Sequence, residues 1–187
     1  MSAPLLAACV PVLNEAASIR ATIESLVGVA DQVFVLDTGS EDGTPDAARA
    51  AVAALAGSCV EVRPDMQAKR VGYAAMRNAV LDLVEQLCDP DVGRARWTLS
   101  ASADEVLVGG GKMRDYLEIY SGTDEALLVE VRTPTGSFLY PRLLRVGGPW
   151  RYEGRVHEQP RHQLDREREP GAQVPGCWIE YRPLDSA

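Results

Sequence analysis

The chain has 187 residues and a formal net charge of -8, so it has the length of one globular domain and no general attraction for nucleic acid or anionic lipid. Its 46% hydrophobic and 25% charged residues are ordinary for a folded globular protein. The 4 cysteines show no CxxC spacing, which argues against a zinc site and against a disulfide framework. The sequence shows neither a basic leader nor an apolar run of membrane-spanning length, so we expect a soluble, cytoplasmic protein.

The first hundred residues alternate between short apolar runs and amphipathic segments. The run 5–12 predicts a strand buried on both faces, and the apolar residues from Ile19 to Ala30 recur with helical spacing. We expect further strands at 32–36, 58–62 and 96–101, and helices at 45–56 and 70–87. Such alternation predicts an α/β fold with a mostly parallel sheet flanked by helices.

The rest of the chain is less regular. A glycine turn at 109–111 precedes an expected helix at 113–120, and two extended segments, 126–132 and 137–146, form an expected antiparallel pair. A polar loop at 161–171 and a last strand at 177–181 follow. We expect one domain over 1–187, made of a regular part, 1–108, and a smaller, irregular part, 109–187.

The loop DTGSEDGT at 37–44 is the most informative segment. An apolar run stops at Asp37, small and polar residues follow, and Pro45 stands in the first turn of the next helix, with Thr44 as its expected N-cap. A strand that ends in this way places polar groups at the carboxyl edge of the sheet, where open α/β sheets bind ligands. The alternative is an ordinary turn in which Asp37 is only a turn former.

Four further motifs stand in a fixed order around this loop: VPVLNE at 10–15 before it, and YAAMRNAVL at 73–81, SASADE at 100–105 and YEGRVHE at 152–158 after it. Together with the loop they resemble the family 2 glycosyltransferases, enzymes of the GT-A fold, over roughly residues 5 to 160. The Val-His-Glu pattern is typical of one subgroup, which includes transferases of surface polysaccharides. One such motif is weak, whereas five in order are specific.

This resemblance implies a GT-A type, Rossmann-like sheet with a nucleotide-sugar site. In the family's pattern Asp37 accepts a hydrogen bond from a base N–H, Pro11 shapes the wall beside the base, and Arg77 pairs with diphosphate or base oxygens through its planar fork. Leu13 stands where many relatives carry an aromatic residue that stacks on the base. A solvated helix face is the alternative for Arg77. The implied nucleotide-binding residues are Pro11, Leu13, Asn14, Glu15, Asp37, Gly39, Ser40, Arg77, Ser102 and Ala103.

The resemblance also implies a divalent metal, Mn²⁺ or Mg²⁺, which favours carboxylate and phosphate oxygens. The family motif Asp-Ala-Asp-Glu is replaced here by SADE, so Ser102 stands in place of the first carboxylate and Asp104 keeps the later one. His157 is the second expected ligand. The alternatives are a surface acidic pair for Asp104 and Glu105, and a hydrogen-bonded strand histidine for His157.

Family 2 enzymes invert the anomeric centre by direct displacement, which needs a carboxylate to take the proton of the attacking hydroxyl. Glu158 is the expected catalytic base, with Glu153 and Glu105 as alternatives. Three aromatic residues near the last motif form either a sugar-stacking wall or part of the core; they are Tyr140, Trp150 and Tyr152.

The expected function is therefore transfer of a sugar from a nucleotide sugar, with UDP favoured, to an unknown hydroxyl of a saccharide, a lipid-linked saccharide, a protein or a modified base. The rival is a degenerate, glycosyltransferase-like nucleotide-binding module without turnover, which Ser102 and Leu13 favour. No GxGxxG follows the first strand, and 109–112 lacks the P-loop spacing. A nucleotidyltransferase of similar fold lacks support because no glycine-rich signature lies near the first strand.

Overall fold

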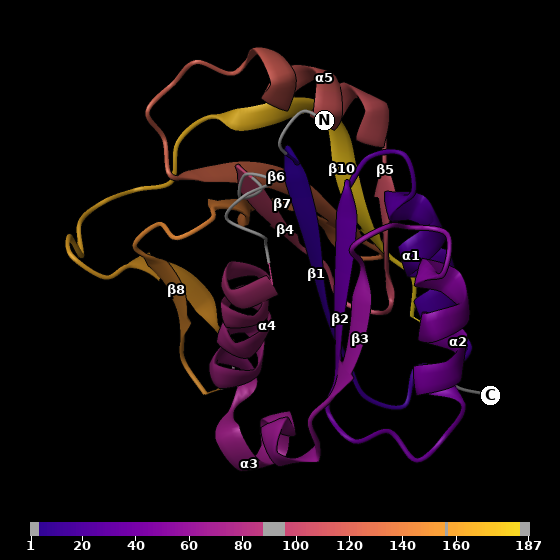
Figure 1. Cartoon of the computed structure of the whole chain (residues 1–187). Coiled ribbons are helices and arrows are strands. Elements are labelled where there is room, and N and C mark those ends of the chain that lie inside the picture. Colours follow the sequence, from indigo (N-terminus) through magenta and orange to yellow (C-terminus); the bar gives the residue numbers. More distant parts are fainter. Residues whose placement is uncertain (1–3, 88–95, 156, 184–187) are drawn as a thin grey trace.

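A mixed sheet in the strand order β3-β2-β1-β4-β7-β6-β10-β5 runs through the computed structural model, which describes residues 4–87, 96–155 and 157–183 (Figure 1). A second, two-stranded sheet pairs β8 with β9. The strands are β1 (Leu6–Val12), β2 (Gln32–Asp37), β3 (Cys59–Val62), β4 (Trp97–Ser100), β5 (Glu105–Val108), β6 (Ala126–Thr133), β7 (Gly136–Arg145), β8 (Trp150–Glu153), β9 (Gln159–His162) and β10 (Gln173–Tyr181). The helices are α1 (Ile19–Leu26), α2 (Thr44–Val52), α3 (Ala68–Val71), α4 (Tyr73–Leu87) and α5 (Gly110–Ile119), with a 3₁₀ turn, η1 (Pro64–Met66).

The first four strands form the parallel part of the sheet. β1 pairs in parallel with β2 and β4, and β2 pairs in parallel with β3. Every residue of β1 is buried, which explains why its sequence is a continuous apolar run rather than an alternating one. The carboxyl ends of β1, β2 and β3 therefore meet at one edge, at the bottom of Figure 1.

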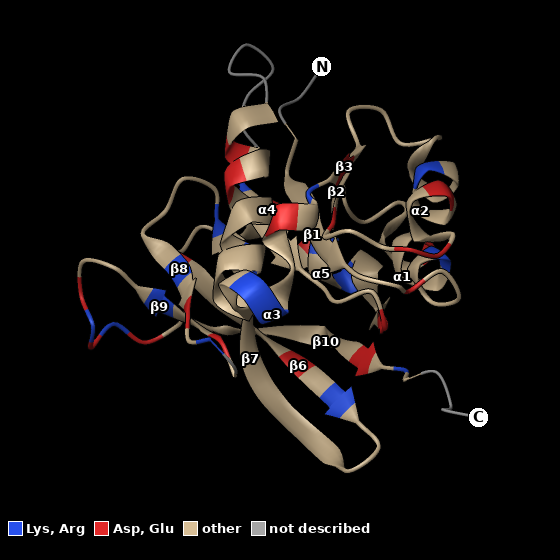
Figure 2. Cartoon of the chain, turned by 90° about the horizontal axis from the view of Figure 1, so that it is seen from below, with Lys and Arg blue, Asp and Glu red and all other residues tan. Residues whose placement is uncertain are grey.

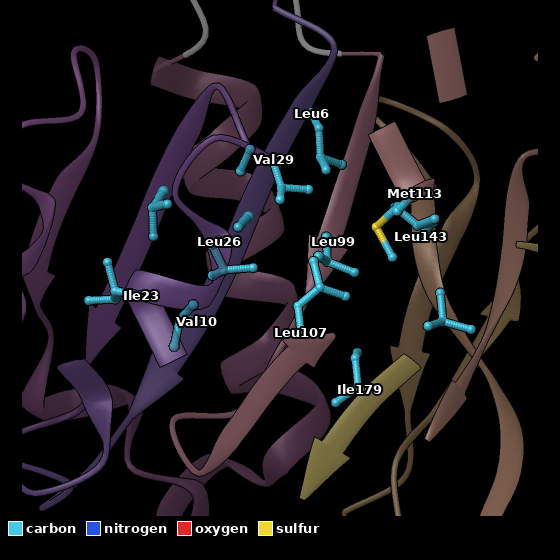
Figure 3. Packing of buried hydrophobic residues seen from close by; sticks show 14 of the residues in the cluster. Leu6, Val10, Ile23, Leu26, Val29, Leu99, Leu107, Met113, Leu143 and Ile179 are labelled. Carbon is cyan, nitrogen blue, oxygen red and sulfur yellow. The ribbon is translucent and has the colours of Figure 1, made fainter. Parts of the chain in front are cut away.

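Helices cover both faces of this part of the sheet. Leu6, Ala8 and Val10 belong to one buried cluster with the apolar side of α1, whereas Ala7 and Cys9 belong to a second cluster with α4. Figure 3 shows side chains from β1, α1, β4 and α5 meeting in the first cluster. The expected α/β architecture is confirmed. Successive side chains of β1 point to opposite faces of the sheet, so each face of this strand has a helix to pack against.

The second half of the chain continues the same sheet. β6 and β7 form the expected antiparallel pair, β7 pairs with β4, and β10 lies between β6 and β5. β5, β8 and β9 were not expected from the sequence, because each has only four residues and gives a short hydrophobic pattern. The expected helix 113–120 begins earlier, at Gly110, and the last strand is longer than expected and carries a bulge.

The expected helix 70–87 is wrong in one respect, because it is broken. α3 ends at Val71, Gly72 has φ 90° and ψ 154°, and α4 begins at Tyr73. A Cβ at Gly72 would lie 3.2 Å from Cγ and 3.3 Å from Cα of Arg155. The backbone conformation and the close approach both require glycine, and hydrophobic spacing does not reveal either.

The start of α2 also differs from the expectation. Thr44 is the first helical residue rather than the N-cap, and Gly43 takes the cap position without a side-chain bond. Asp42 Oδ1 accepts the backbone N–H of Thr44 at 2.9 Å. The Thr44 hydroxyl oxygen instead accepts the N–H of Glu15 at 2.8 Å, so this side chain ties the loop to the end of β1.

No helix in the described part of the chain is long and apolar enough to cross a membrane. No disulfide joins the described cysteines, and Cys88 lies outside the described residues. Burial raises the pKa of the Cys177 thiol to about 11, which keeps that buried side chain neutral.

Gly72→Ala is expected to lower the free energy of unfolding by about 1–3 kcal/mol, because alanine is strained at this backbone conformation. Urea unfolding followed by circular dichroism measures the loss. The matched control is Gly111→Ala in α5, where an added Cβ meets nothing within 4 Å. This control should be neutral or stabilising by up to about 1 kcal/mol. Equal effects of the two substitutions would contradict the assignment of the break to Gly72.

Candidate functional site

A cavity of about 310 Å³ lies at the edge where β1 and β2 end, bounded by α4 and by the turn between β4 and β5. Figure 2 looks onto this edge of the molecule, with α3 near its centre. Seven of the residues expected at the site line the cavity: Pro11, Leu13, Glu15, Arg77, Ser102, Ala103 and Asp104. Asn14, Asp37, Gly39, Ser40, His157 and Glu158 are not among its lining residues.

Asn14 and Ser40 do not line the cavity; they hold together the two loops at this edge of the sheet. Asn14 has φ 54°, its backbone N–H donates to Ser40 Oγ at 2.8 Å, and its Oδ1 accepts the N–H of Glu41 at 2.8 Å. These bonds join the turn after β1 to the loop after β2. The VPVLNE motif and the DTGSEDGT loop therefore form one hydrogen-bonded unit.

Asp37 is completely buried at the end of β2. Its Oδ1 accepts the N–H groups of Gly39 at 2.9 Å and Ser40 at 2.8 Å, so the carboxylate shapes the turn. Its Oδ2 is buried and has no hydrogen-bond partner within the described residues. The turn-forming interpretation is thus supported, and the second oxygen still lacks the donor that a buried carboxylate normally has. A base N–H as that donor stays a prediction.

Arg77 joins three segments of the chain. Its Nε donates to Glu158 Oε1 at 2.7 Å, its Nη1 to Ser100 Oγ at 3.1 Å and its Nη2 to Ser102 Oγ at 3.1 Å. The side chains of Arg77 and Glu158 are only 11% and 14% exposed, which excludes a solvated helix face. Burial opposes the charge, but Tyr152 and Glu158 raise the pKa of Arg77 above its ordinary value, so the guanidinium stays charged.

Glu105 fixes the turn that carries Ser102 and Asp104. It is 6% exposed, its Oε2 accepts the N–H of Ser102 at 2.7 Å, and its Oε1 accepts a bond from Arg142 Nη2 at 2.6 Å. With both oxygens held, Glu105 is a structural residue of the turn. Arg142 lies in the middle of an extended segment, and no motif in the sequence marks it as its partner.

Asp104 lies in an acidic part of the cavity. Burial raises the pKa of Asp104 above its ordinary value, and the nearby charges of Glu105 and Glu15 raise it further. Glu15 lines the same cavity, and one of its carboxylate oxygens accepts a bond from the Ser18 hydroxyl. Burial and neighbouring negative charge both oppose ionisation of this carboxyl group, so a bound cation would be favoured there.

The donor set suits a hard divalent cation only when a ligand supplies further oxygens. Among the described residues, no three His, Cys, Asp or Glu side chains lie close enough together to hold a metal ion. Mg²⁺ commonly uses one or two carboxylates and completes its shell with phosphate oxygens and water. Glu15 and Asp104 fit that pattern. His157 is exposed with φ 58°, and its role as a ligand stays a prediction.

The aromatic residues near the last motif have two different environments. Trp150 and Tyr152 are each 3% exposed and belong to the cluster packed against α4, so core packing is the correct interpretation for them. Tyr140 is partly buried, and its hydroxyl donates to the backbone carbonyl of Glu158. Glu153 is paired with the exposed Arg166 and is not among the residues that line the cavity.

Sequence reasoning missed five residues that line the cavity: Val12, Thr38, Ala68, Tyr73 and Met76. Tyr73 and Met76 precede Arg77 by four residues and one residue, and positions one turn apart share a helix face. The spacing from Arg77 would have found Tyr73. Ala68 lies outside the five motifs, and no residue spacing in the sequence marks it.

Asp104→Asn is expected to raise the free energy of unfolding of the protein in a chelator at neutral pH. A raised pKa in the folded state makes stability fall as pH rises through the interval between the ordinary and the raised value. The gain should shrink as pH is lowered toward the ordinary value of 3.8. Urea unfolding across this range measures it, with the exposed Asp115→Asn in α5 as control. A loss of stability for Asp104→Asn at neutral pH would contradict the sign.

Comparisons with known proteins agree with this architecture. Residues 7–86 match the sequence model of the family described as Glycosyl transferase family 2. The sequence matches none of the curated proteins with which it was compared. S. aureus TarS 1-349 in complex with UDP-GlcNAc is similar with a TM-score of 0.72 and 12% identity, over 98% of this chain and 60% of that chain. A further S. aureus TarS structure gives 0.64 and 13%, over 96% of this chain and 37% of that one.

The mannosyltransferase PcManGT from Pyrobaculum calidifontis, in complex with GDP-Man and Mn²⁺, is similar with a TM-score of 0.52 and 21% identity, over 71% of this chain and 37% of that chain. The chain thus spans between 37% and 60% of the length of these solved proteins. Identities this low show a shared fold. Residues 7–86, less than half of the chain, are thus similar to Glycosyl transferase family 2, and the chain has an α/β fold of the GT-A-like kind found in TarS.

Proposed function

We propose that this protein is a glycosyltransferase that moves a sugar, with inversion, from a nucleotide sugar to an acceptor hydroxyl, assisted by Mn²⁺ or Mg²⁺. The observation that carries the proposal is the single cavity that brings together the end of β1, Arg77 and the two carboxylates Glu15 and Asp104. UDP is the favoured nucleotide, because the TarS structures similar to this chain include complexes with UDP and UDP-GlcNAc. The Val-His-Glu pattern favours the subgroup that includes transferases of surface polysaccharides.

The lining of the cavity suits the different parts of a nucleoside diphosphate. It includes apolar side chains, those of Pro11, Leu13 and Met76, and two carboxylates, those of Glu15 and Asp104. Arg77 uses three of the five donors of a guanidinium in bonds to described residues, which leaves donors for a phosphate or base oxygen. In the proposed complex the base lies against the apolar side chains and the diphosphate lies near the carboxylates.

The negative charge of the diphosphate needs a partner beside these carboxylates. Glu15 and Asp104 are the residues that would hold a divalent cation, together with oxygens of the ligand. When bound, the cation would neutralise the charge that develops on the departing nucleoside diphosphate. Asp104 would position it, and Ser102 adds only a neutral hydroxyl that already accepts a bond from Arg77.

Glu158 is the proposed acceptor of the proton from the attacking hydroxyl. Arg77 donates a hydrogen bond to its Oε1, and the Tyr140 hydroxyl donates to its backbone carbonyl, so both the side chain and the backbone of Glu158 are held. Its Oε2 makes no hydrogen bond to any described residue, which leaves one oxygen for an incoming hydroxyl. The acceptor would be a saccharide, a lipid-linked saccharide, a protein or a modified base.

The second candidate is a nucleotide-binding module of the same fold without turnover. The observation that favours it is Ser102, whose hydroxyl bonds Arg77 where the family pattern has a carboxylate. Leu13 also lines the cavity without offering a ring. The two candidates differ in nucleotide release from a sugar nucleotide and agree in nucleotide binding.

Titration calorimetry with UDP and GDP, with and without Mn²⁺, tests the binding step. We expect UDP to bind, with an affinity that Mn²⁺ increases, because the cation joins the carboxylates to the diphosphate. Asp104→Asn should reduce the gain from Mn²⁺ by at least about tenfold. Asp115→Asn in α5 serves as the control for loss of a negative charge. The proposal fails if neither nucleotide binds under any metal condition.

Glu158→Gln tests the proton-transfer step. The amide keeps an oxygen for Arg77 but accepts no proton, so we expect nucleotide release from a panel of UDP- and GDP-sugars, measured with candidate acceptors, to fall by about 10²–10⁴-fold. UDP affinity should stay within about threefold. Glu153→Gln, in the same segment but paired with Arg166, is the control and should retain activity. Equal rates for the Glu158 and Glu153 variants would remove Glu158 from catalysis.

A further inference from the structure

Tyr73 is a cavity residue with no role so far. It is the one aromatic side chain among the described residues that line the cavity, and it is 46% exposed. No hydrogen bond joins its hydroxyl to another described residue, and it belongs to neither buried cluster. A large ring that is half exposed at a cavity wall offers its face to a ligand.

The backbone holds Tyr73 in a defined position. Gly72 breaks the helix just before it, and the Tyr73 backbone N–H donates to the carbonyl of Arg155 at 3.2 Å. Tyr73, Met76 and Arg77 follow the i, i+3, i+4 spacing of one helix face, and all three line the cavity. The first turn of α4 therefore forms one wall of the cavity, and the aromatic ring of Tyr73 is the most exposed side chain of this wall.

Other lining residues come from the ends of two strands. Pro11 is the second-last residue of β1, Leu13 follows that strand, and Thr38 follows β2. None of these three carries an aromatic ring. Thr38 directly follows the buried Asp37, whose Oδ2 has no hydrogen-bond partner among the described residues. Aliphatic side chains, one aromatic ring and a nearby unpartnered acceptor together suit a flat heterocycle with N–H donors.

We infer that Tyr73 stacks on the base of the bound nucleotide and supplies, from the start of α4, the aromatic face that position 13 lacks. The inference rests on the proposed function, because it needs a nucleotide in this cavity. Stacking uses the π-face that every base has, so Tyr73 contributes affinity for uracil and guanine alike. The choice between bases depends on edge contacts, such as those of Asp37.

The test compares ligands with and without a base. UDP, GDP and inorganic pyrophosphate, each with Mn²⁺, are titrated into the wild type, Tyr73→Phe and Tyr73→Ala. The affinity of Tyr73→Ala for both nucleotides should fall by roughly 5- to 100-fold, and Tyr73→Phe should stay within about twofold. Pyrophosphate affinity should be the same in all three proteins, because it has no base to stack.

Two further variants guard against a purely structural effect. Phe138→Ala removes another exposed aromatic ring, which does not line the cavity, and should bind UDP like the wild type. Adding Leu13→Phe to Tyr73→Ala should restore part of the lost UDP affinity, because it returns an aromatic ring to the lining of the cavity. Thermal unfolding checks that each variant is folded.

The outcomes separate this inference from the proposed function. Wild-type binding of UDP with an unchanged affinity in Tyr73→Ala would overturn the stacking role alone. Equal losses for UDP and pyrophosphate would also overturn it, because the ring would then act on the helix rather than on the base. Failure of the wild type to bind either nucleotide would overturn the proposed function and this inference with it.

Discussion

The guanidinium of Arg77 is the contact on which the site depends. It bonds the turn after β4 through Ser100 and Ser102, and it bonds Glu158 in the segment between β8 and β9. Three pieces of chain far apart in the sequence thus meet at one nearly buried cation. Removing one member of such a pair leaves an unpaired buried charge, which costs about 3–5 kcal/mol. The position of Glu158 and the shape of the cavity are therefore coupled.

A second constraint is the concentration of negative charge near Asp104. Glu105 is neutralised by Arg142, but Glu15 and Asp104 share the cavity without an ion pair to any described basic residue. Because the pKa of Asp104 is raised in the folded state, ionisation of this residue lowers the stability of the protein without a ligand. A bound cation would offset the unfavourable ionisation of Asp104. The same carboxylate therefore favours cation binding and lowers the stability of the free protein.

The sequence predicted the framework well where the signal was local. Buried strands, amphipathic helices and the β6–β7 pair followed from periodicity, and four of the five motifs contribute residues to one cavity at the strand ends. The sequence failed where a contact between distant segments decided the outcome. Gly72 breaks the expected helix at a point where Arg155 packs closely against it, and Thr44 binds the turn after β1 rather than capping its own helix. Trp150 and Tyr152 are core residues because α4 covers them.

The sequence by itself determined the fold class and most of the residues that line the cavity, because strand ends and helix faces follow from spacing within one segment. The tertiary structure alone decided which carboxylates are free and which rings are exposed. Glu105 is held by Arg142 from another strand, whereas Asp104 one residue earlier lines the cavity. Tyr73 becomes a cavity wall only because the break at Gly72 starts α4 there. Such roles depend on partners distant in the chain, and no single-segment pattern contains them.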